Sequence, residues 1–347
     1  MQSECHLSYS SSAYWAKLPR LLTVFYRSTV GLSAKAGFEG ETRQLRICCL
    51  INPRSGPSET PAAEQIEKLF QSHGIAPHIV QLRKGDDIGA LTKSAVQENY
   101  DIIVAGGGDG TINAVASALV GVSSIKLGVL PLGTLNHFAK DLQIPTDIAK
   151  AIENIVAGHV QSIDVGEVNG HIFLNNSSVG LYPSIVKLRE SLQQTGLSKW
   201  PAAARASLQV FLKFRLLRLK LGAAELIRTE YKTALLFVGN NVYDVSFPTL
   251  GTRSTLQRGV MGVMMPHAST RLGLLYNFFA LVFKTQPKSE VLTFETTSLS
   301  VKTKRSFVKV AVDGEVIMLQ SPLNYRIRPK SLSVIVPFTN GAKGKSA

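Results

Sequence analysis

The stretch AGGGDGTINAVASAL, residues 105–119, places three consecutive glycines ahead of Asp109 and Thr111. A glycine-rich turn that leads into a helix exposes backbone N–H groups and the positive end of the helix dipole, so such turns bind phosphate. A carboxylate repels phosphate, so Asp109 in a phosphate-binding turn would be unfavourable unless it has a separate role. Either of two roles removes the conflict: Asp109 holds magnesium on a triphosphate, or it orients a substrate hydroxyl.

Two further loops carry polar groups of the same kind. NPRSG spans residues 52–56 and PLGTLNHFA spans residues 131–139, and each follows an apolar run typical of a strand. Arg54 can meet phosphate charge, and hydroxyl donors are available on Ser55, Thr111 and Thr134. The glycine loop is neither a Walker A loop, which needs Gly-Lys-Ser/Thr, nor a dinucleotide fingerprint, whose third glycine would fall at Thr111. We expect all three loops to meet in one crevice.

Alternating strand and helix signals position these loops. Apolar runs predict strands over residues 45–51, 78–82, 100–105 and 126–130. Helical spacing follows the second of them at Ile88, Leu91, Ala95 and Val96, and the third at Ile112, Val115, Ala116 and Leu119. This order predicts an α/β domain with a doubly wound parallel sheet, residues 43–160, that binds a nucleotide.

The pattern changes after about residue 160. Asn169-Gly170 and Asp313-Gly314 are strong hairpin signals, and apolar-polar alternation flanks both. Further runs predict strands within residues 218–221, 233–239, 297–303, 323–328 and 332–337. Residues 161–322 are therefore predicted to form a mostly antiparallel β-sandwich, with one basic helical insertion around residues 184–214.

Composition limits the class of protein. The 347 residues are 45% hydrophobic and carry a formal net charge of +14, which favours an anionic partner. Three cysteines, Cys5, Cys48 and Cys49, cannot build a disulfide framework, so we expect reduced, buried thiols in a cytosol-like compartment. No apolar run reaches the roughly 20 residues of a membrane-spanning helix. Residues 1–42 are expected to be a disordered extension, with an organelle transit peptide as the alternative.

The motifs NPRSG, GGGDGTIN, PLGTLNHFA, IDVGEVNG and VDGE occur in an order and spacing that resemble the diacylglycerol kinase catalytic domain family. That family includes bacterial soluble lipid kinases and the sphingosine kinases, and the resemblance covers about residues 45–337. GGDGT alone is shared with NAD kinases and phosphofructokinases; the combination of motifs is more specific. The resemblance implies ATP-dependent transfer of a γ-phosphoryl group to a lipid hydroxyl, with Mg²⁺. It also implies that C-terminal strands, residues 323–339, return to the first domain, whereas residues 161–322 bind the lipid.

The resemblance assigns roles residue by residue. Glu315 matches the base that deprotonates the lipid hydroxyl, and Asp109 and Asp164 match acidic residues near the site, with Asp164 in support of magnesium. The matching nucleotide-binding positions are Asn52, Pro53, Arg54, Ser55, Gly56, Gly107, Gly108, Asp109, Gly110, Thr111, Asn113 and Thr134. For Glu315 alone, without the resemblance, a solvated residue after a turn is the alternative.

Three positions depart from the family pattern. His137 stands where many members have aspartate, which alters the polar network. The stretch LGTRSTLQRGVMGVM, residues 250–264, has no acid where bacterial relatives carry a cluster that holds structural magnesium, so that metal is not expected here. SVGLYPSIV, residues 178–186, lacks a common aspartate, which leaves open a catalytically weakened nucleotide- or lipid-binding regulator.

A NAD kinase-like small-molecule kinase is the enzymatic alternative, and nucleic-acid binding has no supporting motif. Residues 199–222 mix apolar side chains with Lys213, Arg215, Arg218 and Lys220, which suits either contact with anionic lipid headgroups or domain packing. We therefore expect a cytoplasmic protein that associates peripherally with membranes, where it meets its lipid alcohol substrate.

Overall fold

The computed structural model describes residues 45–55, 63–180, 216–223, 230–244, 253–266 and 291–338. All of these residues belong to one compact unit that begins at Leu45. Several features predicted from the sequence lie wholly or partly outside the described residues: the extension 1–42, Gly56, the insertion 184–214, and parts of the segments 178–186, 199–222 and 250–264.

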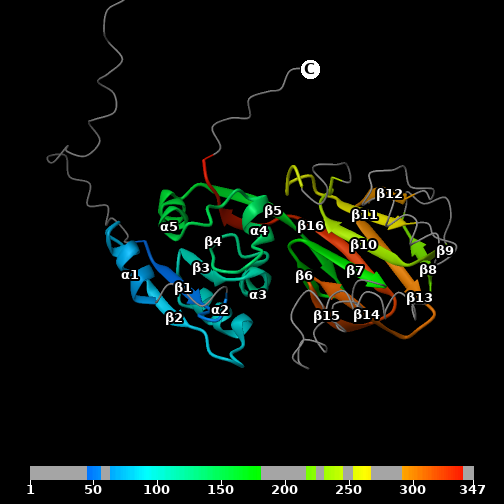
Figure 1. The fold of residues 1–347 in the computed structure, drawn as a ribbon, viewed down its shortest axis with the longest axis horizontal. Helices are drawn as coiled ribbons and strands as arrows, with labels where there is room; N and C mark the ends of the chain where they lie inside the picture. The colour runs from blue at the N-terminus through cyan, green and yellow to red at the C-terminus, as the bar shows by residue number, and fades with distance from the viewer. Residues whose placement is uncertain are drawn as a thin grey trace, which may run out of the picture. The chain divides into compact units, whose positions relative to one another are not determined.

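Four parallel strands form the centre of the first lobe, in the order β2-β1-β3-β4 (Figure 1). Their bounds are β1 Ile47–Ile51, β2 His78–Gln81, β3 Ile102–Gly107 and β4 Lys126–Pro131. The helices that connect and cover them are α1 Ala63–Gln71, α2 Ile88–Gln97, α3 Asp109–Leu119, α4 His137–Asp141 and α5 Ile148–Ala157.

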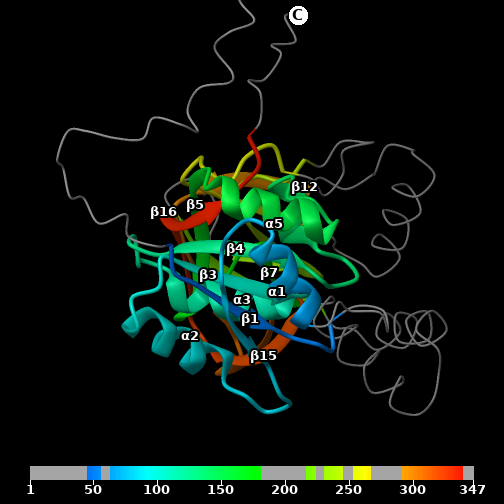
Figure 2. The ribbon, with the colours of Figure 1, turned by 90° about the vertical axis from the view of Figure 1, so that its left-hand side faces the viewer.

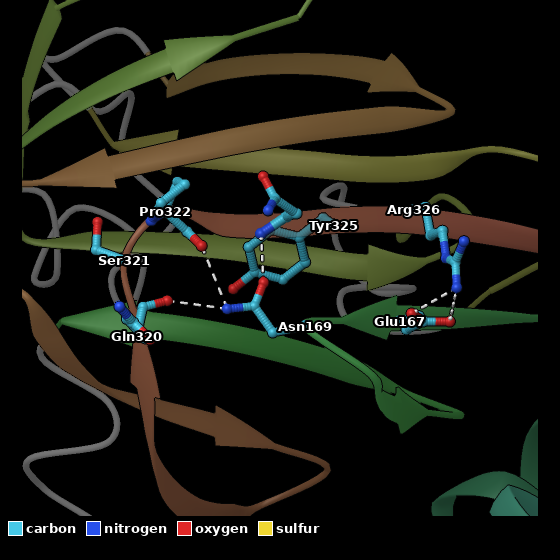
Figure 3. Close-up of a pocket in the computed structure, with 8 residues that line it drawn as sticks. Glu167, Asn169, Gln320, Ser321, Pro322, Tyr325 and Arg326 are labelled. Atoms are coloured by element: carbon cyan, nitrogen blue, oxygen red, sulfur yellow. Dashed lines mark hydrogen bonds and ion pairs between the residues drawn. The ribbon is translucent and has the colours of Figure 1, made fainter.

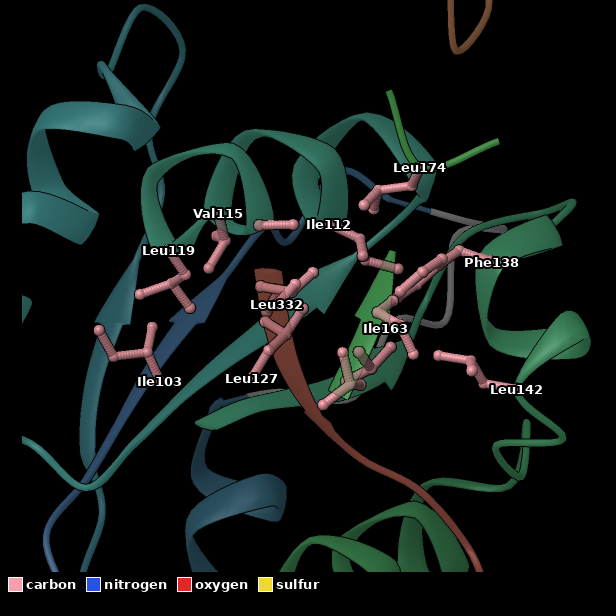
Figure 4. Packing of buried hydrophobic residues seen from close by; sticks show 14 of the residues in the cluster. Ile103, Ile112, Val115, Leu119, Leu127, Phe138, Leu142, Ile163, Leu174 and Leu332 are labelled. Atoms are coloured by element: carbon pink, nitrogen blue, oxygen red, sulfur yellow. The ribbon is translucent and has the colours of Figure 1, made fainter. Parts of the chain in front are cut away.

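Both faces of this sheet are covered, because its strands are apolar on both sides. Residues of α1 and α5 pack on one face, against Ile47, Cys49 and Val104. Residues of α2, α3 and α4 pack on the other face, against Leu50 and Ile103 (Figures 2 and 4). The predicted doubly wound sheet is confirmed, and so is the prediction of buried, unpaired thiols for Cys48 and Cys49.

The second lobe is a β-sandwich. One layer is the antiparallel sheet β12-β11-β10-β7-β14-β15. Its strands are β7 Asn176–Gly180, β10 Leu235–Asn240, β11 Met261–Pro266, β12 Val291–Thr296, β14 Phe307–Val312 and β15 Glu315–Gln320. The other layer extends the first sheet through β16 Leu323–Ile335, β13 Ser298–Thr303, β8 Leu217–Gly222 and β9 Glu230–Thr233. The apolar faces of the two layers enclose a core that includes Val179, Leu236, Val301 and Tyr325.

Strand β16 belongs to both lobes. Its first half pairs with β13, and its second half lies parallel to β4, with Val334 opposite Leu127. Along its whole length β16 also pairs antiparallel with β5 (Val160–Val168), which pairs in turn with β6 (His171–Phe173). The sequence predicted two separate strands here, but the structure has one strand with an irregular register between Arg328 and Leu332.

Both predicted hairpins are confirmed. Asn169 and Gly170 have φ of 46° and 87°, and Asp313 and Gly314 have φ of 45° and 89°. Two successive residues with positive φ are what a type I′ turn requires, and Asn-Gly and Asp-Gly tolerate that geometry best. No helix among the described residues has the length and apolar character needed to cross a membrane.

Candidate active site

The three polar loops meet at the carboxyl edge of the parallel strands. The Asn52 backbone N–H donates to Gly106 O at 2.8 Å, and its side-chain amide donates to Thr111 Oγ1 at 3.1 Å. From the third loop, the Phe138 N–H donates to Asp109 Oδ1 at 3.3 Å. The expected convergence is therefore confirmed by direct hydrogen bonds.

Close packing of these loops explains why they carry so few side chains. A Cβ atom on Gly133 would lie 2.5 Å from the Cα of Gly108, and one on Gly107 would lie 2.6 Å from Thr111 Oγ1. Gly108 is the N-cap of α3 and offers no side chain to cap the first N–H groups of that helix. Those N–H groups therefore stay available for an anion.

The loop before α4 is held by the amide of Asn136. This side chain donates to Pro131 O at 3.1 Å and to Gly133 O at 2.8 Å, and it accepts from the Gly133 N–H at 3.0 Å. Thr134 and His137 are exposed on the same loop. Pro53 and Arg54 are likewise exposed on the first loop, so these predicted binding residues face solvent at the same edge.

Glu315 lies on the other side of the crevice. The Asp313-Gly314 turn brings the exposed Glu315 so close to the first turn of α3 that a Cβ atom on Gly110 would lie 3.5 Å from Glu315 Oε1. Between them lies a cavity of about 330 Å³. Its lining includes Gly110, Asn113, Gly170, His171, Asp313 and Glu315. The structure thus brings the glycine loop and Glu315 to one pocket.

Asp313 fixes the turn that presents Glu315. Its carboxylate accepts backbone N–H groups from Leu174 at 2.7 Å, Asn175 at 2.9 Å and Asn176 at 3.0 Å, and it also accepts the Asn113 amide. Burial raises the pKa of the Asp313 carboxyl, while these four donors act in the opposite direction. Asn113, a predicted nucleotide ligand, thus connects α3 to the Glu315 hairpin.

A second connection runs through Arg253, whose side chain is 1% exposed. Its guanidinium binds Asp141 at the end of α4, with Nε donating at 3.0 Å. It also donates to Leu174 O at 2.8 Å, Asn240 O at 3.0 Å and Asn175 Oδ1 at 2.9 Å. Arg253 therefore links the helix whose N-terminus holds Asp109 to the segment whose N–H groups hold Asp313.

Asp164 has a different environment from the other predicted acids. It is fully buried, and its oxygens accept the Gly259 N–H at 2.6 Å, the Lys330 N–H at 2.8 Å and the Asn241 amide at 3.2 Å. It is not among the residues that line the pocket beside Glu315. These donors belong to the 253–260 loop, the β16 irregularity and the end of β10, so the contacts give Asp164 a role in ordering the chain, and its catalytic role stays a prediction.

Sequence reasoning treated Asp313 only as a turn residue and did not single out Asp141 or Arg253 as site residues. The Asp-Gly pair was the one available signal for Asp313, and nothing local marks Arg253 as buried. Among the described residues, no group of three or more His, Cys, Asp or Glu side chains is arranged to hold a metal ion.

Part of the chain is similar to one family of known proteins. Residues 46–168 match the family model of the diacylglycerol kinase catalytic domain. The chain is 34% identical over 138 residues to a diacylglycerol kinase of Staphylococcus carnosus (strain TM300) and 42% identical over 140 residues to one of Staphylococcus aureus (strain JH9). Each match covers 39% of this chain, and the chain spans 45% and 44% of the length of these two relatives.

The fold has a counterpart among solved structures. A crystal structure of a candidate diacylglycerol kinase from Bacillus anthracis str. Sterne superposes with a TM-score of 0.63. The alignment covers 86% of this chain and 99% of that one at 20% sequence identity. At this identity the likeness establishes the two-lobed fold and nothing finer.

Proposed function

Since residues 46–168 match the family model of the diacylglycerol kinase catalytic domain, we propose that this protein is an ATP-dependent lipid kinase. Its acceptor is the hydroxyl of diacylglycerol or a related lipid alcohol, such as a sphingoid base. One observation carries the proposal: Gly110, which directly follows Asp109 at the start of α3, and the hairpin with Glu315 border the same pocket. Phosphoryl transfer needs an element that binds the phosphates and, next to it, a group that positions or deprotonates the acceptor hydroxyl.

The first lobe supplies the groups for the nucleotide. The uncapped N-terminus of α3 offers backbone N–H groups to phosphate, and Arg54 is exposed at the same edge. The close approach of Gly108 and Gly133 keeps the second and third loops together at this edge. ATP is therefore proposed to place its phosphates over the loops that begin at Asn52, Gly106 and Pro131.

Asp109 fits magnesium at this position. Kinases bind Mg²⁺ through one or two carboxylates together with the substrate's own phosphates, so no dedicated cluster is needed. Asp109 Oδ1 is turned toward the Phe138 N–H, while Oδ2 has no hydrogen bond within the described residues. When bound, the ion neutralises charge on the transferring phosphoryl group.

Glu315 is proposed to accept the proton of the lipid hydroxyl. It is exposed at the pocket and has no hydrogen-bond donor among the described residues, so its carboxylate can turn to a substrate. Asp313 holds the hairpin in position. Because the backbone at Glu315 is already fixed, less conformational entropy is lost when Glu315 orients the hydroxyl.

The test is phosphoryl transfer from labelled ATP with magnesium, offered separately to mixed micelles of diacylglycerol, to a sphingoid base and to NAD. A labelled lipid is the expected product, and the preferred acceptor identifies the lipid class. Labelled NADP would instead establish the NAD kinase alternative. ATP binding by calorimetry without any product would establish the regulator.

A lipid acceptor also sets the place of action. The substrate resides in a membrane, so we propose a cytoplasmic protein that works while bound peripherally to a bilayer. Cell fractionation of a tagged full chain tests this: recovery in the membrane pellet that salt removes is expected, and recovery only in the supernatant would contradict it.

A further inference from the structure

The outer surface of the sandwich layer formed by β16, β13, β8 and β9 is strongly basic. Along the first half of β16, the core-facing Leu323, Tyr325 and Ile327 alternate with outward residues. Those outward residues include Arg326 and Arg328, whose side chains are 57% and 39% exposed. This alternation puts every second residue of each strand on one outer face.

Strand register gathers further cations on that face. Lys302 lies opposite Lys220, and Arg218 lies opposite Lys232. We call the set formed by Arg218, Lys220, Lys232, Lys302, Arg326 and Arg328 the basic face. Among the described residues, two acids share it: Glu230, in an exposed ion pair with Lys220, and Glu167, beside the arginines. Within the described residues, Arg218, Lys232 and Lys302 form no ion pair, so the face keeps a net positive charge.

The two arginines are oriented by one buried carboxylate. Glu167 is 7% exposed and accepts Arg326 Nη2 at 2.8 Å and 3.0 Å on its two oxygens, and Arg328 Nε on one of them. Burial raises the pKa of Glu167, but the hydrogen bonds and charges of the two arginines outweigh this effect, and the net pKa is lowered. Two guanidinium groups on one carboxylate leave one positive charge, held in a fixed orientation at the surface.

A pocket of about 470 Å³ lies next to Arg326. Figure 3 shows its lining residues, with the Arg326–Glu167 pair on one side of Asn169 and Gln320, Ser321 and Pro322 on the other. The Asn169 side chain donates to Gln320 O at 2.9 Å and to Pro322 O at 3.2 Å. The pocket is close to the candidate active site, because Asn169 lines it while the next residue, Gly170, lines the cavity with Glu315.

From this arrangement we infer that the basic face docks the protein on an anionic lipid bilayer and that the pocket beside Arg326 receives a phosphate headgroup. The inference rests on the proposed lipid kinase function, because docking here would bring bilayer lipid next to the Glu315 pocket. The positive charge of the face is complementary to anionic lipid. Its side chains disfavour single-stranded nucleic acid, because the outward positions of these strands hold Lys, Arg, Ser, Asn, Gly and Glu, and none of the aromatic side chains on which bases stack.

Co-sedimentation of the full chain with vesicles tests the docking surface. Phosphatidylcholine vesicles with and without phosphatidylglycerol are compared, and binding is expected only with the anionic lipid. The triple variant Arg218→Gln, Lys232→Gln, Lys302→Gln should bind on the order of 100-fold more weakly, at about five-fold for each basic residue. The matched control, Lys84→Gln, Lys93→Gln, Lys150→Gln, removes the same charge from exposed positions of the first lobe and should bind like the wild type.

A charge-neutral variant tests the headgroup pocket. Arg326→Gln combined with Glu167→Gln leaves the net charge unchanged, so a loss of binding of about five-fold or more would report the oriented guanidinium rather than overall charge. Circular dichroism and the unfolding midpoint establish that each variant is folded. Wild-type binding by this double variant would overturn the headgroup pocket.

Three results would overturn the docking surface. The first is wild-type vesicle binding by the folded triple variant, and the second is an equal loss of vesicle binding in the control variant. The third is a triple variant that loses binding to single-stranded DNA, offered in place of vesicles, but keeps its vesicle binding. Activity on micelle-dispersed lipid is measured in parallel. A wild type that docks through this face but transfers no phosphate would refute the proposed function and leave the docking surface standing.

Discussion

Two turn regions in the second lobe are built around a carboxylate that accepts backbone N–H groups, and only the one at Asp313 borders the candidate pocket. Asp164 accepts the backbone N–H groups of Gly259 and Lys330, and Asp313 accepts those of Leu174, Asn175 and Asn176. In both places the carboxylate satisfies N–H groups that irregular backbone would otherwise leave unpaired.

The difference lies in what stands beside each carboxylate. Asp313 is two residues from the exposed Glu315 and is bound by Asn113 of α3, whereas Asp164 lies among loops outside the Glu315 pocket. A carboxylate whose oxygens are all engaged orders the chain, and a reactive one needs a free oxygen at a cavity. An acidic residue in a matching motif therefore reveals its role only through its hydrogen-bond partners.

Replacement of the accessible acid should give the largest effect. Glu315→Gln is expected to lower kcat by about 10²–10⁴-fold, because the amide cannot accept the hydroxyl proton. Initial rates with labelled ATP and micellar diacylglycerol measure it. Glu153→Gln, on the exposed surface of α5, is the matched control. A Glu315→Gln enzyme with wild-type kcat would remove Glu315 from the mechanism.

The next effect concerns the buried cation that connects the two lobes. Arg253→Met should lower the free energy of unfolding by about 3–5 kcal/mol, because Asp141 and several carbonyl oxygens lose their donor. Arg258→Met, in the same acid-free stretch, breaks only an exposed pair with Glu295 and should cost about 1 kcal/mol or less. Urea unfolding of both variants measures the difference, and equal losses would contradict the assigned role of Arg253.

The paired carboxylates can be compared directly. Asp164→Asn and Asp313→Asn should each cost about 1–3 kcal/mol of unfolding free energy, because an amide NH₂ cannot accept the N–H groups around it. Only Asp313→Asn should also lower kcat, since it alone holds the Glu315 turn. Urea unfolding and kcat are measured on both folded variants. A comparable fall in kcat for Asp164→Asn would support the catalytic role that the motif predicts for Asp164.

The smallest effect is a dependence on pH. The pKa of Glu167 is lowered in the folded protein, so its contribution to stability is present above about pH 4.5, its ordinary value, and is lost as the pH falls through the folded-state pKa. Wild type should therefore be more stable than Glu167→Gln near neutral pH, and the gap should shrink in acid. Thermal unfolding across this range measures it, and a gap that stays constant in acid would contradict the lowered pKa.

Much of the frame was predictable because its signals are local. Strands β1, β3 and β4, the buried face of α3 and the two type I′ turns follow from periodicity and from residues that tolerate positive φ. The convergence of the three loops also followed, because parallel strands must end at one edge. The boundary between a lipid-binding domain at residues 161–322 and C-terminal strands at residues 323–339 stays a prediction.

Other features had no local signal. Residues 323–328 and 332–337 looked like two strands, but β16 continues through the irregularity at Lys330, whose N–H is satisfied by Asp164. Asn113 matched a nucleotide-binding position, yet its amide binds a carboxylate 200 residues away in the chain. Hydrogen-bond partners that lie far apart in the chain are brought together by the packing of the lobes, so the sequence around either residue does not predict them.

The sequence by itself determined the element types, the turns and the loop edge, because periodicity and backbone preference act over a few residues. Only the tertiary structure decided which carboxylates accept hydrogen bonds from the chain and which keep a free oxygen, since that depends on donors from distant segments. Glu315 borders the pocket that Gly110, the residue after Asp109, also lines, whereas Asp164 is enclosed by donors from distant segments. Burial and hydrogen bonding in three dimensions separate these acids, although all three carry the same chemical group.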